Sequence, residues 1–429
     1  MKNNFKYLFL GLLTCSLASC AGSNYYDGDY KGGYGGAHED ADYGYKGGSA
    51  VPAGSYAAAE MMGSEAPATS GEVGASKGKD YIIPAGQLTA SALDDNKYYD
   101  FWQEITSRGQ ESNGPLYPYK TLAKDNFVTQ NRIKLTVKNA NDIYITLKED
   151  NKTFHVDNFH NAYLFAKNAR EEYEVTISYL DTNGERQSVD KTVKNNDEID
   201  LENEFTTANN LEIMFVIDAT GSMGDEMNYV KSEITDVISK VKNANPTSKV
   251  ALAMMVYRDT RDEYTTRYSD FTENIDSQKA FLSRQTAAGG GDYEEAVDVA
   301  LAEAVDKQWS TVGTKLLFHV ADAPAHDKDL AAWSAAADKA AAKGIQIMTI
   351  AASGINRKTE FYFRSQSLIT GGQYVFLTDD SGIGNSHEKP TVPEKLTVEY
   401  LNDCIIRLIN GYHKGVMEEP VDYTQVVKQ

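Results

Sequence analysis

The hydrophobic positions follow different rhythms along the chain, and the second half carries the clearest one. From residue 211 onward, continuous apolar runs alternate with segments whose apolar residues recur at helical spacing. The run "LEIMFVI" at 211–217 is typical of a strand covered on both faces. Apolar residues then follow it at helical spacing: Met227, Val230, Ile234, Val237, Ile238 and Val241.

Further strands are expected in "KVALAMMVY", "KLLFHVAD", "IQIMTIAA" and "QYVFLT". Further helices are expected in "DYEEAVDVALAEAV", "DLAAWSAAADKAAAKG", "TEFYFRSQSLITGG" and "EKLTVEYLNDCIIRLING". This alternation predicts a doubly wound, Rossmann-like α/β domain over residues 209–413, followed by a C-terminal tail at 414–429.

Residues 131–206 alternate with a period of two instead, which predicts short half-buried strands. In "RIKLTVK" one face carries Ile133, Leu135 and Val137. Asn183-Gly184 is a hairpin turn signal. We expect a small antiparallel β-sandwich, which resembles the immunoglobulin-like or carboxypeptidase-regulatory-like modules of bacterial surface proteins. The module is assigned residues 80–207, and its N-terminal extension, 80–128, is expected to pack on a neighbouring domain.

Residues 1–20 carry two lysines, a short apolar stretch and the sequence "LASC". The stretch is typical of a signal peptide and too short for a permanent membrane span. Small residues before Cys20 resemble the bacterial lipobox, which would make Cys20 the acylated first residue of the mature chain. The alternative is an ordinary signal peptide or a membrane anchor that happens to contain a cysteine. Residues 21–79, rich in Gly, Ala, Ser, Tyr and Asp, are expected to form a flexible linker.

The charge of the chain limits its possible partners, and its cysteine content limits its possible disulfides. Acidic residues outnumber basic ones by 62 to 42, and the net charge of -20 disfavours nucleic acid and gains nothing from an anionic bilayer. A lipid at Cys20 would therefore have to anchor the chain to a membrane. Only Cys404 would then remain in the folded part, so no intramolecular disulfide is expected. Its helical, apolar surroundings predict a buried small side chain.

Three acidic residues lie in predicted loops at the carboxyl ends of the strands. Asp218 follows the strand at 211–217, Asp292 precedes a helix, and Asp322 follows "KLLFHVA". These strand ends meet at one edge of a doubly wound sheet, where ligand sites form. Within "DATGS", Thr220 and Ser222 add neutral hydroxyls, which together with a carboxylate suit a hard divalent cation. The alternative is a turn and a helix cap.

"DATGS", the glycine-rich second loop and the strand-end Asp322 resemble the metal-ion-dependent adhesion site (MIDAS) of von Willebrand factor type A (VWA) domains. The resemblance covers residues 209–413. It implies a divalent-metal site, usually Mg²⁺ with Ca²⁺ or Mn²⁺ as alternatives, that captures an acidic group of a protein ligand without turnover. "DATGSM", "VYRD", "GGGD" and "ADAPAHD" are closer to the subgroup in hemicentin-like and alpha-kinase-associated domains.

The sequence departs from the commonest pattern of that family in two places. Thr220 replaces the more frequent serine, which keeps the hydroxyl. The second loop lacks the usual threonine, and "GGGDYEEAV" offers Asp292 as a ligand instead; the alternative for Asp292 is an exposed helix N-cap. Three nearby residues are assigned structural roles: His326 as a loop-ordering hydrogen-bonding group, and Arg258 and Asp259 as loop residues. Glu226 is expected to contact the site through water or to complement the helix dipole.

These observations predict a non-enzymatic, metal-dependent protein-binding lipoprotein of the bacterial cell envelope. Ala21 and Gly22 show no aspartate-type retention signal, which by resemblance favours the outer membrane; which face it occupies stays open. One alternative is an envelope scaffold with a structural metal. The other is a metal-dependent hydrolase using Asp218, Asp292 and Asp322, against which the sequence reveals no histidine–carboxylate pair.

Overall fold

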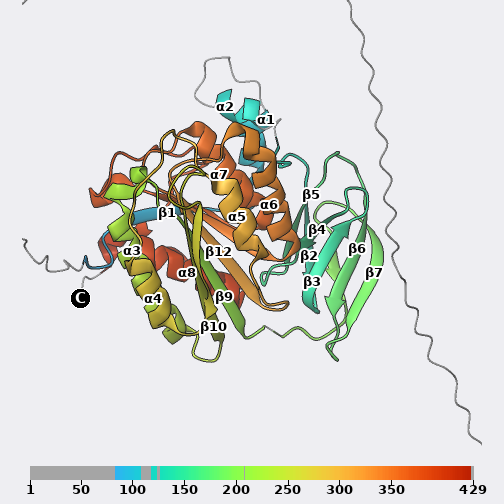
Figure 1. Ribbon diagram of the computed structural model, residues 1–429. Helices are drawn as coiled ribbons and strands as arrows, with labels where there is room; N and C mark the ends of the chain where they lie inside the picture. Colours follow the sequence, from blue (N-terminus) through green and yellow to red (C-terminus); the bar gives the residue numbers. More distant parts are fainter. Residues whose placement is uncertain (1–82, 108–116, 123–125, 207, 427–429) are drawn as a thin grey trace, which may run out of the picture. The chain divides into compact units, whose positions relative to one another are not determined.

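The structure, a computed structural model, describes residues 83–107, 117–122, 126–206 and 208–426 (Figure 1). The predicted signal peptide, the lipid attachment point Cys20 and the linker at 21–79 lie outside these residues. All the described residues fall in one compact unit. Within them, no helix is both long and apolar enough to cross a membrane.

A mostly parallel sheet forms the centre of the larger part, as the sequence predicted. Its strand order is β11-β10-β9-β12-β13-β14-β1-β15. The five parallel strands are β9 (Asn210–Asp218), β10 (Lys249–Tyr257), β12 (Thr314–Ala321), β13 (Ile345–Ala351) and β14 (Tyr374–Leu377). The antiparallel strands are β11 (Thr266–Thr272) at one edge, and β1 (Thr89–Leu93) and β15 (Glu399–Tyr400) at the other. The edge strand β11 is half-exposed and polar, so the apolar pattern gave no sign of it.

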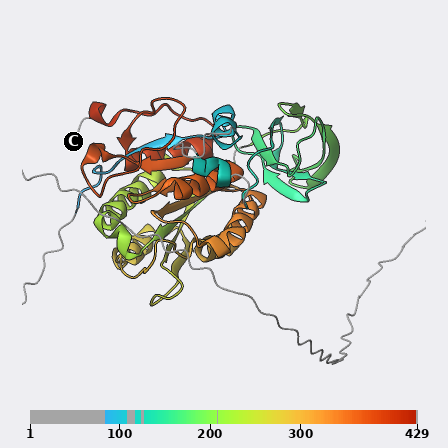
Figure 2. The same ribbon diagram turned by 90° about the horizontal axis from the view of Figure 1, so that it is seen from above.

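Helices cover both faces of this sheet, which makes the α/β domain doubly wound (Figures 1 and 2). One face shares a core with α3 (Met227–Ala244), α4 (Ile275–Ser283) and α8 (Leu401–Lys414). The other shares a core with α5 (Val297–Asp306), α6 (Leu330–Ala342) and α7 (Arg357–Thr370). The free cysteine Cys404 is buried in the first of these cores, as predicted.

Two predicted helices begin later than expected. The helix predicted from Asp292 begins only at Val297, because Glu295 forms an isolated parallel bridge with Ala325 and holds the preceding residues extended. The last helix begins at Leu401, after the short strand β15 has paired with β1. Acidic side chains placed on the first turn of the predicted helix therefore lie in a loop.

Residues 132–200 form a small sandwich of two sheets, ordered β5-β2-β8 and β4-β3-β6-β7. The strands are β2 (Arg132–Lys138), β3 (Asn141–Leu147), β4 (Lys152–His155), β5 (Asn161–Phe165), β6 (Tyr173–Leu180), β7 (Arg186–Val193) and β8 (Glu198–Asp200). The expected hairpin joins β6 to β7, and Gly184 takes the positive φ of 77° that this turn requires. The expected antiparallel sandwich is present, with the exception that β8 pairs with β2 in parallel.

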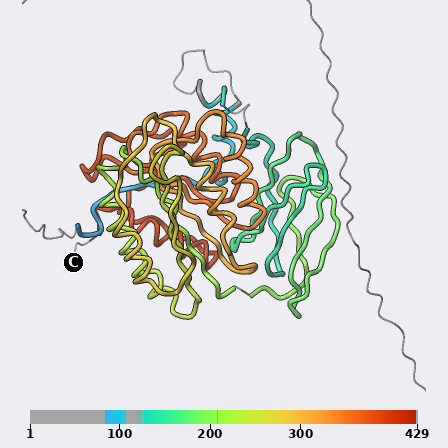
Figure 3. Tube along the Cα trace, in the orientation of Figure 1, coloured from blue at the N-terminus to red at the C-terminus, as the bar shows by residue number. Residues whose placement is uncertain are grey.

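The N-terminal extension belongs to the α/β domain and not to the β-sandwich. Strand β1 pairs with β14 over four residues, so the expected boundary of the module at residue 80 is wrong (Figure 3). The helices α1 (Tyr99–Ser107) and α2 (Tyr117–Leu122) follow it, and Trp102 stacks on Phe361 of α7 with ring centroids 5.6 Å apart. The expectation that this segment packs on a neighbouring domain agrees with these contacts.

A carboxylate clamps the chain just before β1. Glu233 of α3 accepts hydrogen bonds from the backbone amides of Gly86, Gln87 and Leu88 at 2.8, 2.7 and 3.1 Å. Because Glu233 is fully buried, these three bonds replace the water that the carboxylate loses. The clamp fixes the point at which the chain enters the sheet.

The β-sandwich is packed directly on the α/β domain. Asn158 donates to the carbonyl oxygen of Tyr412 at 2.9 Å, and Lys152 pairs with Asp338 of α6 at 2.7 Å. The His155 ring lies against Gly344, where a Cβ would come within 2.9 Å of it. The core on the α7 side continues into the sandwich, which explains why the two parts form one unit.

The extension is also held by a buried ion pair. Arg364 of α7 and Asp95 are 0% and 3% exposed, and Arg364 Nε donates to Asp95 at 2.9 Å. Asp95→Ala is expected to lower the free energy of unfolding by about 3–5 kcal/mol, because it leaves the Arg364 guanidinium buried beside fewer partners. Lys138→Ala, which breaks the exposed pair with Glu198, is the control and should cost less than about 1 kcal/mol. Equal losses in urea unfolding of the two variants would contradict this assignment.

Candidate metal centre

The turn after β9 gathers three oxygen-bearing side chains. Asp218, the last residue of the strand, is fully buried. Its Oδ1 accepts hydrogen bonds from the Thr220 amide at 2.9 Å and the Thr220 hydroxyl at 2.6 Å. The Ser222 hydroxyl lies 3.3 Å from that of Thr220. Thr220 makes no side-chain capping hydrogen bond to the 3₁₀ helix Gly221–Asp225, so the hydroxyl is held by Asp218 and does not act as a helix cap.

Asp322 reaches this turn from the end of the neighbouring strand β12. It is 3% exposed, and burial raises the pKa of its carboxyl group, while the facing Ser222 hydroxyl opposes part of that rise. Burial, followed by the charge of Asp322, also raises the pKa of Asp218. The structure therefore brings together Asp218, Thr220, Ser222 and Asp322, four of the five predicted site residues.

A third buried carboxylate, Glu295, was missed by the sequence analysis. It is 2% exposed, and a Cβ built on Gly290 would lie 3.0 Å from its Oε1 and 3.6 Å from Cβ of Thr220. Burial raises the pKa of Glu295 to about 9, with Asp218 the largest of the neighbouring charges that add to the effect. The expected helix would have placed Glu295 on a first turn. Its backbone instead pairs with Ala325, next to the strand end that carries Asp322.

Each of these three carboxylates has one buried oxygen without a hydrogen-bond partner. These atoms are Asp218 Oδ2, Asp322 Oδ1 and Glu295 Oε2. Buried carboxylate oxygens are costly unless they are paired, hydrogen-bonded or bound to a metal. Three such oxygens beside two neutral hydroxyls form a set of hard donors, which fits a divalent cation such as Mg²⁺ or Ca²⁺. Asp218, Thr220, Ser222, Asp322 and Glu295 are the residues that could hold it.

The glycine-rich second loop is held against the first by backbone contacts. Gly221 donates its amide to the Gly289 carbonyl oxygen at 3.2 Å, and Arg258 Nε donates to the Ala219 carbonyl oxygen at 3.0 Å. Gly289 has a φ of +85°, and a Cβ there would collide with Asp262. Glycine at this position therefore permits both the positive φ and the close approach of the Asp262 side chain.

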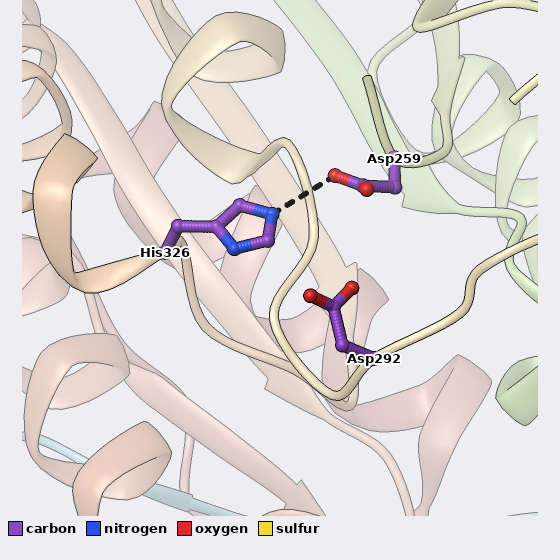
Figure 4. Close-up of side chains that lie close together, drawn as sticks. All are labelled: Asp259, Asp292 and His326. Carbon is purple, nitrogen blue, oxygen red and sulfur yellow. Dashed lines mark hydrogen bonds and ion pairs between the residues drawn. The ribbon is translucent and has the colours of Figure 1, made fainter. Parts of the chain in front are cut away.

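Asp292 lies in a different group of side chains. It is exposed, and its carboxylate comes within 4.8 Å of ligand atoms of Asp259 and His326 (Figure 4). In the described part of the chain, no comparable set of three joins Asp292 to Asp218 and Asp322. The alternative of a helix cap is wrong, because the residue before α5 is Ala296.

Asp259 and His326 form a histidine–carboxylate ion pair, which the sequence did not reveal. His326 Nε2 lies 3.0 Å from Asp259 Oδ1. The two residues are 67 positions apart, and only the fold brings the end of β10 beside the loop after β12. The structure therefore contains a histidine–carboxylate pair that was not visible in the sequence.

Glu226 lies near the candidate centre, and its charge contributes to the raised pKa of Asp322. It is fully buried, and its carboxylate accepts from the Ser353 amide at 3.3 Å and lies 3.0 Å from His387 Nε2. It makes no capping bond to α3. The sequence analysis did not expect these direct contacts, and the water-mediated contact and the helix-dipole role stay predictions. His387 is 161 positions away, so the sequence offered no signal for it.

The domain that carries this centre is similar to several known proteins. Residues 212–382 match the family model described as von Willebrand factor A domain. Among curated proteins, the chain is 27% identical over 188 residues to a putative ariadne-like RING finger protein of Acanthamoeba polyphaga mimivirus, covering 39% of this chain and 18% of that protein. It is 24% identical over 205 residues to the alpha-protein kinase vwkA of Dictyostelium discoideum, covering 47% and 33%. The matches thus span a third or less of these relatives.

Three solved structures also share features of the fold. They are the conserved hypothetical protein BatB from Bacteroides thetaiotaomicron (15% identity, 48% of this chain and 99% of that chain, TM-score 0.34) and an aerotolerance-related membrane protein from Bacteroides fragilis (15%, 49% and 92%, 0.27). The third is the pilus adhesin SpaC from Lactobacillus rhamnosus GG (12%, 64% and 33%, 0.33). These likenesses are too weak to bear on the partners or location of this chain.

The raised carboxyl pKa values predict how stability depends on pH. A carboxyl group whose pKa is raised by folding favours the folded state while protonated, and this stability is lost as pH rises from its ordinary value through the folded-state value. With a chelator present, Asp218→Asn should therefore gain thermal stability relative to the wild type as pH rises from about 5 to about 8. Adding Mg²⁺ at the upper pH should stabilise the wild type more than the variant. Parallel pH curves for the two proteins would contradict the prediction.

Proposed function

Because residues 212–382 match the family model described as von Willebrand factor A domain, we propose that this chain is a non-enzymatic, divalent-metal-dependent protein-binding protein of the bacterial cell envelope. The observation that supports the proposal most strongly is the set of unpartnered, buried oxygens of Asp218, Asp322 and Glu295 beside two hydroxyls. A bound cation supplies Lewis acidity and open coordination positions for an acidic group of a protein ligand.

The residues of the proposed metal centre have different roles in binding the cation. The Asp218 and Asp322 carboxylates provide the negative charge that holds the cation, and the Thr220 and Ser222 hydroxyls add donor atoms without further charge. Glu295, with a pKa raised to about 9, is protonated at neutral pH before a cation arrives. The metal-free centre then carries two negative charges at most, which a divalent cation balances. A centre balanced in this way can still accept an acidic ligand, with Mg²⁺ favoured and Ca²⁺ or Mn²⁺ as alternatives.

Two alternatives make different predictions. An envelope scaffold with a structural metal would keep its partner when the metal is removed. A metal-dependent hydrolase is favoured by one observation, the His326–Asp259 pair, because a histidine–carboxylate pair can act as a general base. We favour binding because the three buried carboxylates and two hydroxyls form a cation site that needs no general base.

The location at the envelope rests on Cys20 and on residues 1–20, outside the described residues. A lipid at Cys20 would anchor a chain whose charge of -20 gives it no electrostatic attraction to an anionic membrane. The absence of an aspartate at 21 or 22 favours the outer membrane.

The metal requirement is tested by capture of envelope proteins on the full-length chain, with Mg²⁺ or with a chelator. A domain cut at residue 209 would lack β1, so the whole chain is needed. The wild type should retain a partner in Mg²⁺ and release it in chelator, whereas Asp218→Ala should retain none. Asp276→Ala, an exposed acidic residue of α4, is the matched control and should behave as the wild type. Retention of the same partner by the wild type in chelator would establish the scaffold instead.

Lipid attachment is tested by fractionation of cells that express the chain. Cys20→Ser should move the protein from the membrane fraction to the soluble fraction and abolish incorporation of a labelled fatty acid. Cys15→Ser should change neither, because bulkier Thr14 precedes that cysteine. Membrane retention of Cys20→Ser without label would indicate an uncleaved anchor in place of a lipid.

A further inference from the structure

We propose that Asp259, Asp292 and His326 form a second cation site, selective for a borderline transition metal such as Zn²⁺ and distinct from the oxygen-lined centre at Asp218. The three residues come from three separate segments. Asp259 follows β10, Asp292 lies in the glycine-rich loop, and His326 follows β12. Their ligand atoms nevertheless all lie within 4.8 Å of one another.

The spacing of the three groups suits a small tetrahedral ion. Ligands at about 2.0–2.1 Å from Zn²⁺ in tetrahedral geometry lie about 3.4 Å apart. Asp259 Oδ1 and His326 Nε2 are already 3.0 Å apart, and Asp292 would close a gap of at most 4.8 Å by a small side-chain movement. In Figure 4 its carboxylate points toward the other two groups.

A loop-ordering ion pair explains only part of this arrangement. The contact between Asp259 and His326 accounts for those two side chains. It does not account for Asp292, whose carboxylate forms no hydrogen bond or ion pair with any other described residue although it lies beside them. A second acidic group placed next to an Asp–His pair adds repulsion unless a cation offsets it.

An independent observation comes from Glu295, which is 2% exposed and has an unpartnered Oε2. Its amide donates to the Pro324 carbonyl oxygen at 2.9 Å, and it bridges to Ala325, directly before His326. Its Oε1 faces Gly290, whose amide donates to Asp262 at 2.9 Å. Asp262 in turn accepts the Asp259 amide at 3.1 Å. The buried, unsatisfied Glu295 is therefore tied through its backbone to the residue before His326, and through Gly290 and Asp262 to Asp259.

The donor set separates the two sites by chemistry. The centre at Asp218 offers oxygen atoms alone, which suit Mg²⁺ or Ca²⁺. The second site offers an imidazole nitrogen, which those ions bind poorly and Zn²⁺ binds well. Two carboxylates and a neutral imidazole carry a charge of minus two, which Zn²⁺ neutralises. Three protein ligands leave a fourth position for water, as in open zinc sites.

The test is calorimetric titration of Zn²⁺ into the full-length, untagged, metal-stripped chain, in saturating Mg²⁺ so that the oxygen-lined centre is occupied. Cys15 and Cys20 are replaced by serine in every protein, because free thiols also bind Zn²⁺. The starting protein should bind one Zn²⁺. His326→Gln and Asp292→Asn should each weaken that binding by more than about tenfold, since losing even an outer-shell partner costs about 10–100-fold. Asp292 is exposed, so its variant tests the site without risk to folding.

Two controls separate this site from the proposed metal-dependent binding. Asp218→Ala should keep Zn²⁺ binding while losing the response to Mg²⁺, and Asp276→Asn should change neither. Absorption of bound Co²⁺ in the visible range should change on His326→Gln, because a nitrogen ligand is lost. The proposal is overturned if the chain binds no Zn²⁺ in saturating Mg²⁺. It is also overturned if binding is lost in Asp218→Ala and unchanged in His326→Gln and Asp292→Asn.

Discussion

Three carboxylates are buried at one edge of the sheet, and the surrounding loops have to accommodate them. Asp218, Asp322 and Glu295 each have an oxygen without a partner, and among the described residues no lysine or arginine forms an ion pair with them. The nearby Arg258 donates to the backbone carbonyls of Ala219 and Thr286 instead. A cation bound to these oxygens would hold the loops of this edge together, in addition to the backbone hydrogen bonds that place the loops.

Much of the fold could be predicted from the sequence because the central strands are buried on both faces. The apolar run of β9 predicted a buried strand, and the helical spacing in α3 predicted a helix. Strand β1 was assigned to the wrong part because "TASAL" is short and weakly apolar, and its partner β14 lies almost 300 residues away. The parallel pairing of β8 with β2 was hidden for the same reason, since a three-residue strand has no period of its own.

The residues of the candidate sites also differ in whether the sequence could predict them. Asp218 ends β9, Thr220 and Ser222 follow it closely, and Asp322 directly follows β12, so their meeting at the sheet edge could be predicted from the strand order. Glu295 was hidden by a helix expected to begin five residues too early, which made Asp292 the obvious acidic residue of that loop. The pairing of His326 with Asp259 depends on how two loops cross in space, which a periodic pattern does not record.

The clamp of Glu233 on residues 86–88 would connect the proposed attachment to the proposed binding site mechanically. Strand β1 runs antiparallel to β14, so the chain enters the sheet at the carboxyl edge that also carries Asp218 and Asp322. If the chain is anchored at its N-terminus and a ligand is held at the metal, tension between the two passes through Glu233 into α3. Helix α3 begins at Met227, five residues beyond Ser222. A pull on the anchor would thus reach the cation-binding turn along one helix, without crossing the β-sandwich.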